Sequence, residues 1–455
     1  MVADGTEGTV LALGAAHQNV LVGGPHDTDF YACASYSLVV GAPQGIIDTI
    51  NKSINVAKSC LKLGQFAFAP IAPVLGALAE VGTLVQAILA FVPTDKPDPY
   101  AEIRTQLKVL GQEIEELSKA MTAKFNDLKE FLIELNFYRE VIVPTSNMTS
   151  YMQDCLKNPN EHSLENFKNA YSKHSPLSLA KTVLSLLDYD TTNPLKIAMS
   201  NDPLRTKNTF NKWFYIIDGI LGQLLFLEAF SSGLLHNKST NNPDALKRDS
   251  EEIFKNMAAW KEEYKKSSAY WPAVKEFVER SLKENEKKSN DEQADAIKKT
   301  LETILTYDSF YIMVTDHYKN DSWRMQFYVH NKEQLHEFYG PGNGNCLIYR
   351  SRKANLVDQE KLTRLRRDVK RTFMQNDMSF EKQLNPKVLF KSYDTPDYME
   401  PGWYEAGFVG VFHELNEALL SANCDKNSGE PGWWSKVKTL PYFHETTRHL
   451  LVGHI

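Results

Sequence analysis

Hydrophobic positions follow a helical period through the first two-thirds of the chain. From Gln44 to Leu61, apolar residues recur at steps of three and four, which places them on one face of an α-helix. Similar stripes predict further helices over Tyr100–Tyr138, Ser163–Tyr171, Ser175–Leu187, Thr209–Leu235, Asp244–Tyr264, a segment ending at Lys288, and Ser289–Leu305. The pattern predicts a multi-helix bundle.

One segment is far more apolar than the rest. Between Lys62 and Asp95 the only charged residue is Glu80, and the prolines before Val74 leave a predicted helix over Val74–Val92. Roughly 20 apolar residues are needed to span a bilayer. Three interpretations stay open: a helix buried within a bundle, a conditional membrane insertion, and a permanent span. The candidate insertion residues are Val74, Leu78, Glu80, Val81, Val85 and Leu89.

The apolar helix and the next one are expected to form a hairpin. Prolines at 93, 97 and 99 predict a rigid turn, after which apolar residues of Tyr100–Tyr138 keep a coiled-coil spacing with a single stutter. That seam is a candidate surface for homo-oligomer formation. A second apolar stretch, Trp213–Leu235, contains Asp218 and Glu228, and we interpret it as buried core.

Near Tyr307 the hydrophobic period changes from 3.6 to 2. Phe310–Thr315 and Trp323–Val329 predict strands that pair as a β-hairpin, and Cys346–Tyr349 and Val388–Lys391 predict further strands. The predicted fold is therefore mainly α: a flexible leader (1–44), a helical bundle domain (45–306) and a smaller α+β C-terminal domain (307–455).

Composition excludes some classes of function. The net charge of -6 over 455 residues argues against nucleic acid as a partner. The five cysteines form no CxxC pair, so they indicate neither a zinc site nor a disulfide-dense scaffold. Four Asn-x-Ser/Thr sequons are compatible with export, but residues 1–44 contain no Lys or Arg and do not resemble a signal peptide.

No enzyme motif is complete. His413-Glu414-Leu-Asn-Glu417 lacks the second His that a zinc protease helix requires, and the Gly-rich segment at Gly340 lacks the Lys-Ser/Thr of a phosphate loop. We expect no enzymatic activity, no cofactor and no resident metal. A metal site drawing on His444, His449 and His454 stays open as an alternative.

A basic amphipathic segment follows Arg352. Its bases outnumber its acids around a narrow apolar stripe, which suits contact with anionic lipid headgroups or, alternatively, a solvated face on its own domain. The candidate headgroup-contact residues are Arg364, Arg366, Arg367, Lys370 and Arg371.

The hairpin, with its AFVPTDKPDPYAEI turn and its EIRTQLKVLGQEIEELSKAMTAKFNDLKEFL helix, resembles the rapunzel-like and cephalotoxin-like proteins. The passage KKTLETILTYDSFYIMVTDHY resembles the end of the same family's helical domain. In architecture the bundle is also similar to jellyfish toxins, whose helical domain is likened to that of insecticidal crystal toxins. The resemblance covers about Ile46–Tyr318 and implies venom proteins that act on membranes, alongside members without known lytic activity.

Together these observations favour a secreted, non-enzymatic, pore-forming toxin-like protein whose apolar helix inserts on contact with the membrane of a target cell. The alternative is a non-lytic interaction or structural protein that uses the bundle as a scaffold. The receptor is not indicated by the sequence.

Overall fold

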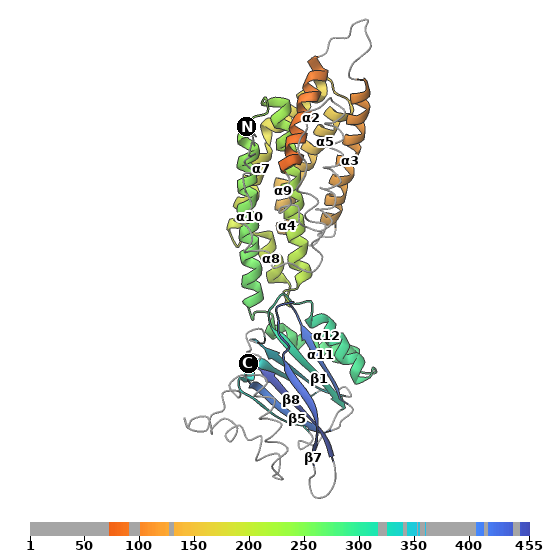
Figure 1. Ribbon diagram of the computed structural model, residues 1–455, viewed down its shortest axis with the longest axis vertical. Helices are drawn as coiled ribbons and strands as arrows, with labels where there is room; N and C mark the ends of the chain where they lie inside the picture. Colours follow the sequence, from red (N-terminus) through yellow and green to blue (C-terminus); the bar gives the residue numbers. More distant parts are fainter. Residues whose placement is uncertain are drawn as a thin grey trace, which may run out of the picture. The chain divides into compact units, whose positions relative to one another are not determined.

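The computed structural model of the chain describes residues 72–90, 101–126, 132–316, 325–339, 344–352, 354, 360, 406–413, 417–439 and 446–455. The fold is mainly α, and a smaller antiparallel β part follows towards the C-terminus (Figure 1). The predicted fold class is confirmed. The predicted leader, the stripe over Gln44–Leu61, the strand at Val388–Lys391 and the basic segment from Arg364 to Arg371 lie outside the described residues.

The described helices match most of the predicted stripes. They are α2 (Ala72–Ala90), α3 (Ala101–Asn126), α4 (Leu132–Phe137), a π-helical turn (Tyr138–Ile142), α5 (Val143–Lys157), α6 (Glu161–Lys173), α7 (Pro176–Asp188), α8 (Pro194–Asn201), α9 (Lys207–Leu235), α10 (Asn241–Lys266), α11 (Trp271–Glu284) and α12 (Asn290–Leu301). No predicted helix corresponds to α5 or α8. The single helix predicted over Tyr100–Tyr138 corresponds to α3, α4 and the first π-helical residue, and residues 127–131 between α3 and α4 lie outside the described part.

Two predicted helix starts are present as hydrogen-bonded caps. The Ser175 hydroxyl accepts from the Ser178 amide at 3.2 Å, with Pro176 as the first residue of α7. Ser289 and Glu292 cap each other at the start of α12, since each side chain accepts from the other's backbone N–H. Such caps satisfy amides that have no partner inside the helix, so they fix where a helix begins.

The described residues form two compact units. The first contains the described residues up to Ala123, with Ile142–Ala180 and Asp218–Lys247, and the second contains those of Lys124–Val141, Lys181–Ile217 and Arg248–Ile455. Helices α9 and α10 contribute residues to both units. The predicted domain ranges, 45–306 and 307–455, stay predictions.

Helix α9 is a core helix. Among the described side chains it is the one helix long and apolar enough to cross a membrane, and 89% of its apolar window is buried. In α2 the described apolar stretch is the shorter segment Leu78–Ala90. In the first unit, Phe230 packs edge-on against Phe167 of α6 at 5.4 Å between ring centroids. Burial on all sides explains why its sequence shows no polar stripe. The interpretation of Trp213–Leu235 as buried core is confirmed.

Two antiparallel sheets make up the β part of the second unit. The first has the order β3 (Leu335–Tyr339), β4 (Gly344–Ser351), β1 (Ser309–Asp316), β6 (Ala418–Asn423). The second has the order β2 (Met325–Val329), β5 (Ala406–His413), β8 (Thr446–His454), β7 (Gly432–Thr439). Strands β3 and β4 pair from Tyr339 opposite Asn345, and residues 340–343 of the Gly-rich segment lie outside the described residues.

The predicted β-hairpin is wrong. β1 pairs with β4 and β6, with Ile312 opposite both Ile348 and Leu420, while β2 pairs with β5 in the other sheet. Both faces of β1 are apolar and buried. The strands that pair with it are therefore determined by packing on both faces of the sheet, and not only by the turn that follows β1 in the sequence. The strand itself was found, but its partners were not.

The first sheet lies between two apolar layers. On one face, Phe310, Ile312 and Val314 pack with residues of α11 and α12. On the other face, alternate residues including Tyr311 and Met313 pack with Phe408 and other side chains of the second sheet. The helices that cover the sheet therefore precede it in the chain, on the N-terminal side of the boundary predicted near Thr306.

Candidate functional site

The predicted insertion residues lie in α2, which belongs to the first unit. Leu78, Val81 and Val85 are buried together with Ile88, at steps of three and four that place them on one face of the helix. Leu89 is partly buried, and Gln86 on another face is exposed. Val74 is in the helix, but its side chain lies outside the described ones. Among the described residues, the helix buried on all sides is α9, and α2 has one buried face.

Two glycines bring the backbones of α2 and α9 into contact. A Cβ added to Gly82 would lie 2.3 Å from the Phe230 carbonyl oxygen, and one added to Gly233 would lie 1.7 Å from the Ala79 carbonyl oxygen. Any larger residue at either position would have to push one backbone away from the other. The two glycines therefore set how closely the helices approach.

The lone charge of α2 has a partner on the loop between α9 and α10. Lys238 Nζ donates to Glu80 Oε1 at 2.6 Å, and both side chains remain partly exposed to solvent. Lys238 and its neighbour Asn237 both adopt left-handed backbone conformations, with φ of 62° and 48°. The Lys238 amide donates to the Ser232 carbonyl at 2.8 Å, which anchors this loop to the last turn of α9. An ion pair this exposed adds at most about 1 kcal/mol to stability.

A buried carboxyl group lies one helical turn before Ser232. Glu228 of α9 is fully buried, and Tyr171 of α6 donates a hydrogen bond to its Oε1 at 2.8 Å. Burial raises the pKa of Glu228, while the bond from Tyr171 opposes that rise. Asn242 of α10 in turn donates to the Tyr171 hydroxyl at 3.2 Å. The neighbouring cavity has a volume of about 340 Å³, and Glu228, His236, Asn237, Ser239, Asn241 and Asn242 line it.

The alternative metal site was predicted from His444, His449 and His454. His449 and His454 are in strand β8, and His444 lies outside the described residues. His449 Nδ1 pairs with Glu417, the residue that takes the place of the second His in the incomplete protease motif. No group of three or more His, Cys, Asp or Glu side chains suited to a metal ion occurs in the described part of the chain. The pairing of Glu417 with His449 had no local signal in the sequence.

One family comparison bears on this chain. A family model described as "Protein of unknown function (DUF684)" matches residues 105–441. The chain belongs to the DUF684 family. No curated protein and no solved structure matches the chain. The DUF684 match includes α9 and the loop that carries Lys238, and it begins after α2.

Proposed function

We propose that the protein perturbs or permeabilises membranes without enzymatic chemistry, and that α2 is the element that enters the lipid. One observation carries the proposal. Helix α2 has 19 residues with one charge, and that charge is neutralised by a partner outside the helix, on the loop after α9. At 1.5 Å per residue the helix is about 28 Å long, close to the roughly 30 Å of a bilayer's hydrocarbon core.

Release of α2 from α9 is the conformational step of this proposal. The buried face formed by Leu78, Val81, Val85 and Ile88 would lose its contacts with the protein. Each such side chain contributes roughly 1.5–3 kcal/mol when buried, so release into water is unfavourable. Lipid tails replace those apolar surroundings, and a helix satisfies its own backbone hydrogen bonds there. Insertion is therefore expected only where a membrane is present.

The remaining parts of the proposal concern partners and location. A secreted protein would meet the lipid of a target cell, where the basic residues from Arg364 to Arg371 would contact anionic headgroups. The apolar seam of α3 is the candidate surface for a homo-oligomer, although Leu107, Leu110 and Ile114 are buried in the folded chain. To form an oligomer, the seam would have to leave its contacts within the chain and pack against the seam of another copy. The resemblance to cephalotoxin-like proteins supports the same class of function.

A reversible cross-link tests the proposal. Cysteines replace Glu80 and Lys238, whose side chains meet, and Cys33 and Cys60 are changed to Ser so that only the new pair reacts. A short cleavable bis-maleimide then ties α2 to the α9–α10 loop. We expect dye release from liposomes to be lost on cross-linking and to return on cleavage. Equal leakage before and after cleavage would contradict release of α2.

The scaffold alternative is favoured by a specific observation, the backbone contact at Gly82 and Gly233, which holds α2 firmly against α9. A matched control separates the two functions. Thiols at Glu165 and Asn169, exposed neighbours one turn apart in α6, accept the same reagent without tying α2. Leakage by this control, together with loss in the Glu80/Lys238 pair, supports insertion. No leakage from the uncross-linked or wild-type protein supports the scaffold.

A further inference from the structure

The helix-covered face of the first sheet contains a buried charged side chain, Arg350. Along β4, Cys346 and Ile348 pack into the apolar layer beneath α11 and α12, and Arg350 follows at the same two-residue step. Arg350 is 4% exposed. A buried guanidinium at a position where the strand period predicts an apolar residue requires a specific explanation.

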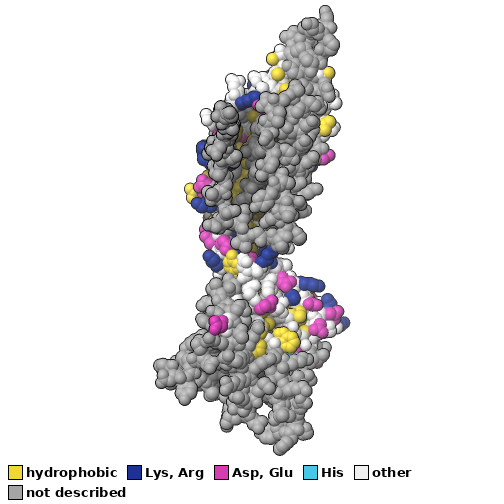
Figure 2. All heavy atoms as spheres, in the orientation of Figure 1, with side chains coloured by type: hydrophobic (Ala, Val, Ile, Leu, Met, Phe, Trp, Pro, Cys, Tyr) yellow, Lys and Arg dark blue, Asp and Glu magenta, His cyan; other side chains and the backbone are white. Residues whose placement is uncertain are grey.

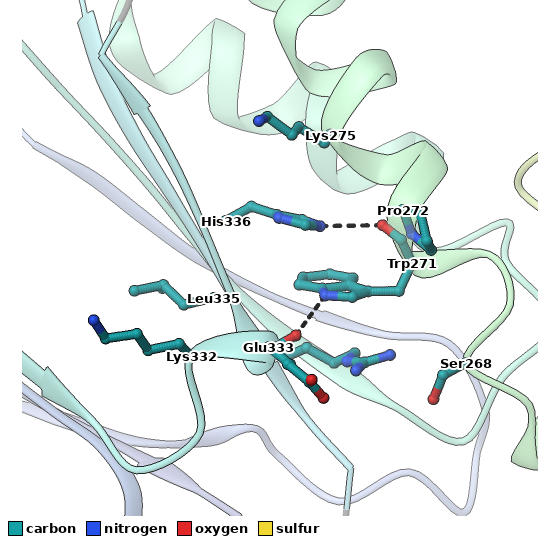
Figure 3. Close-up of a pocket in the computed structure, with 9 residues that line it drawn as sticks. Ser268, Trp271, Pro272, Lys275, Lys332, Glu333, Leu335 and His336 are labelled. Carbon is teal, nitrogen blue, oxygen red and sulfur yellow. Dashed lines mark hydrogen bonds between the residues drawn. The ribbon is translucent and has the colours of Figure 1, made fainter.

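An aromatic side chain of α11 covers this arginine. Arg350 Cζ lies 4.6 Å from the centre of the Trp271 ring, and His336 of β3 stacks on that ring at 4.0 Å. Trp271 Nε1 donates to the Glu333 carbonyl at 2.6 Å, and His336 Nε2 donates to the Trp271 carbonyl at 3.1 Å. Figure 3 shows His336 and Trp271 as parallel layers, with Lys275 on the far side of His336. The indole is thus fixed in place as one wall of a pocket.

The pocket contains polar atoms without protein partners. Arg350 Nε and Nη1 and Ser268 Oγ are buried, and none of them has a hydrogen-bond partner. The nearest carboxylate oxygen, Asp308 Oδ2, lies 3.7 Å from Arg350 Nη1, which is too long for a hydrogen bond, and it already accepts from Tyr270 at 2.6 Å. Burial also raises the pKa of Asp308, which weakens it as a counter-charge. Buried donors without acceptors are rare in folded proteins.

The charge around the pocket is positive. Exposed Lys275 and Lys332 line it with Arg350, against the single carboxylate of Glu333. Burial lowers the pKa of His336, so its ring is neutral at pH 7. Figure 2 shows both signs of charge on the surface of α11 and α12, so the cationic excess belongs to the pocket and not to the whole face. The pocket volume is about 530 Å³, within the roughly 300–1,000 Å³ of small-molecule sites.

We propose that this pocket binds a phosphate group. The unpaired N–H donors of the Arg350 guanidinium suit a tetrahedral anion. Lys275 and Lys332 line the same pocket and add positive charge at its rim. The Ser268 hydroxyl supplies a further donor, and the Trp271 ring excludes water from one side. The phosphate comes from a soluble phosphate ester or from a phosphomonoester lipid headgroup. The site is in the second unit, and it does not depend on insertion of α2.

Calorimetric titration of the full chain tests the site with inorganic phosphate at fixed ionic strength. We expect saturable binding with one phosphate per chain. Lys275→Gln together with Lys332→Gln should weaken it about tenfold or more, because the two changes remove two positive charges from the pocket rim. Both side chains are exposed, so the fold is retained. Lys283→Gln, an exposed lysine of the same helix that does not line the pocket, should leave binding unchanged. Arg350→Lys keeps the positive charge but removes the planar guanidinium with its several N–H donors, and it should also weaken binding.

The source of the phosphate is distinguished by flotation with phosphatidylcholine vesicles that contain phosphatidic acid. Release of the protein from these vesicles by inorganic phosphate, but not by chloride at equal ionic strength, would assign the pocket to a lipid headgroup. Phosphate binding in solution without such competition would assign it to a soluble ester. Absence of phosphate binding, or equal weakening by Lys283→Gln and the pocket variants, would overturn the proposal.

Discussion

Lys238 and Glu80 are separated by 158 positions in the sequence and meet at 2.6 Å in the structure. The lysine is held there by a loop whose left-handed residues and hydrogen bond to Ser232 leave it little freedom. The only charge of α2 is therefore neutralised by a residue that would stay behind if α2 moved. Substitution of Glu80 is therefore the most direct test of the proposed insertion.

Changing the charge of Glu80 should change leakage in a set order. Glu80→Gln removes the charge and should leak as much as the wild type or more. Glu80→Lys puts an ammonium near the centre of the helix, which costs about 2.5–3.5 kcal/mol in lipid, or roughly a hundredfold in the inserted population relative to the uncharged Glu80→Gln. Dye release from liposomes measures the effect. Glu284→Lys, with the same change in net charge on α11, is the control, and equal leakage by all variants would rule out insertion of this segment.

The glycine contact between α2 and α9 predicts a large loss of stability for Gly233→Ala. The added Cβ would lie 1.7 Å from the Ala79 carbonyl oxygen, so the two backbones must separate. We expect the free energy of unfolding to fall by about 2–3 kcal/mol, measured by urea denaturation. In Gly111→Ala the new Cβ meets the flexible Lys157 side chain at 3.2 Å, and a helix gains up to about 1 kcal/mol from that change. Similar losses in both variants would contradict the assigned contact.

The buried carboxyl group of Glu228 predicts a pH-dependent gain in stability for Glu228→Gln. Because burial raises the pKa of Glu228 in the folded state, its contribution is favourable below the unfolded pKa and is lost as pH rises through the folded pKa. The amide oxygen of Gln can still accept from Tyr171. Thermal unfolding should therefore show a higher Tm for the variant at pH 7 and no gain below about pH 4.3, the unfolded pKa of Glu.

Glu292 provides the opposite sign as a control. Its pKa is lowered by hydrogen bonds from the Ser289 backbone and hydroxyl, so its contribution is present at neutral pH and is lost as pH falls. Glu292→Gln should lower the Tm at pH 7 and have little effect in acid. A Tm change for Glu228→Gln that followed this same direction would contradict the assigned burial.

The described cysteines should not react in the folded protein. Cys155, Cys346 and Cys424 are buried, and burial raises the pKa of Cys155 to about 11, so little of the reactive thiolate forms. With Cys33 and Cys60 changed to Ser, Ellman's reagent should label no thiol at pH 8 until denaturant is added, and then three. Fast labelling of a native thiol would show that the structure around that cysteine opens readily.

The helices were largely predictable, because their signals are local. The cap residues Ser175 and Ser289 and the apolar content of α9 each gave the right element. Helix α5 was missed because the predicted helices ended at Tyr138 and resumed at Ser163. In the structure, Pro144 lies in the first turn of α5, a position that tolerates the missing N–H of proline.

Contacts between distant residues were not predictable in the same way. Nothing near Glu80 indicates Lys238, and Lys238 itself adopts a backbone conformation that lysine rarely favours. The strands that pair with β1, and the Phe408 layer on one of its faces, come from segments later in the chain. Arg350 did leave a signal, because it interrupts the apolar alternation of Cys346 and Ile348. That signal was overlooked beside the more basic segment that follows it.

The order of strands in the first sheet has a consequence for synthesis of the chain. β1 lies between β4 and β6, and β6 leaves the ribosome only after β2 to β5 have been made. Until then α11 and α12 lack Ala418 and Ala422 from their apolar layer, and β1 keeps an unpaired edge. Nascent chains stalled before β6 should therefore bind holdase chaperones and be cleaved near β1, because an exposed edge strand and uncovered apolar helices are recognised together.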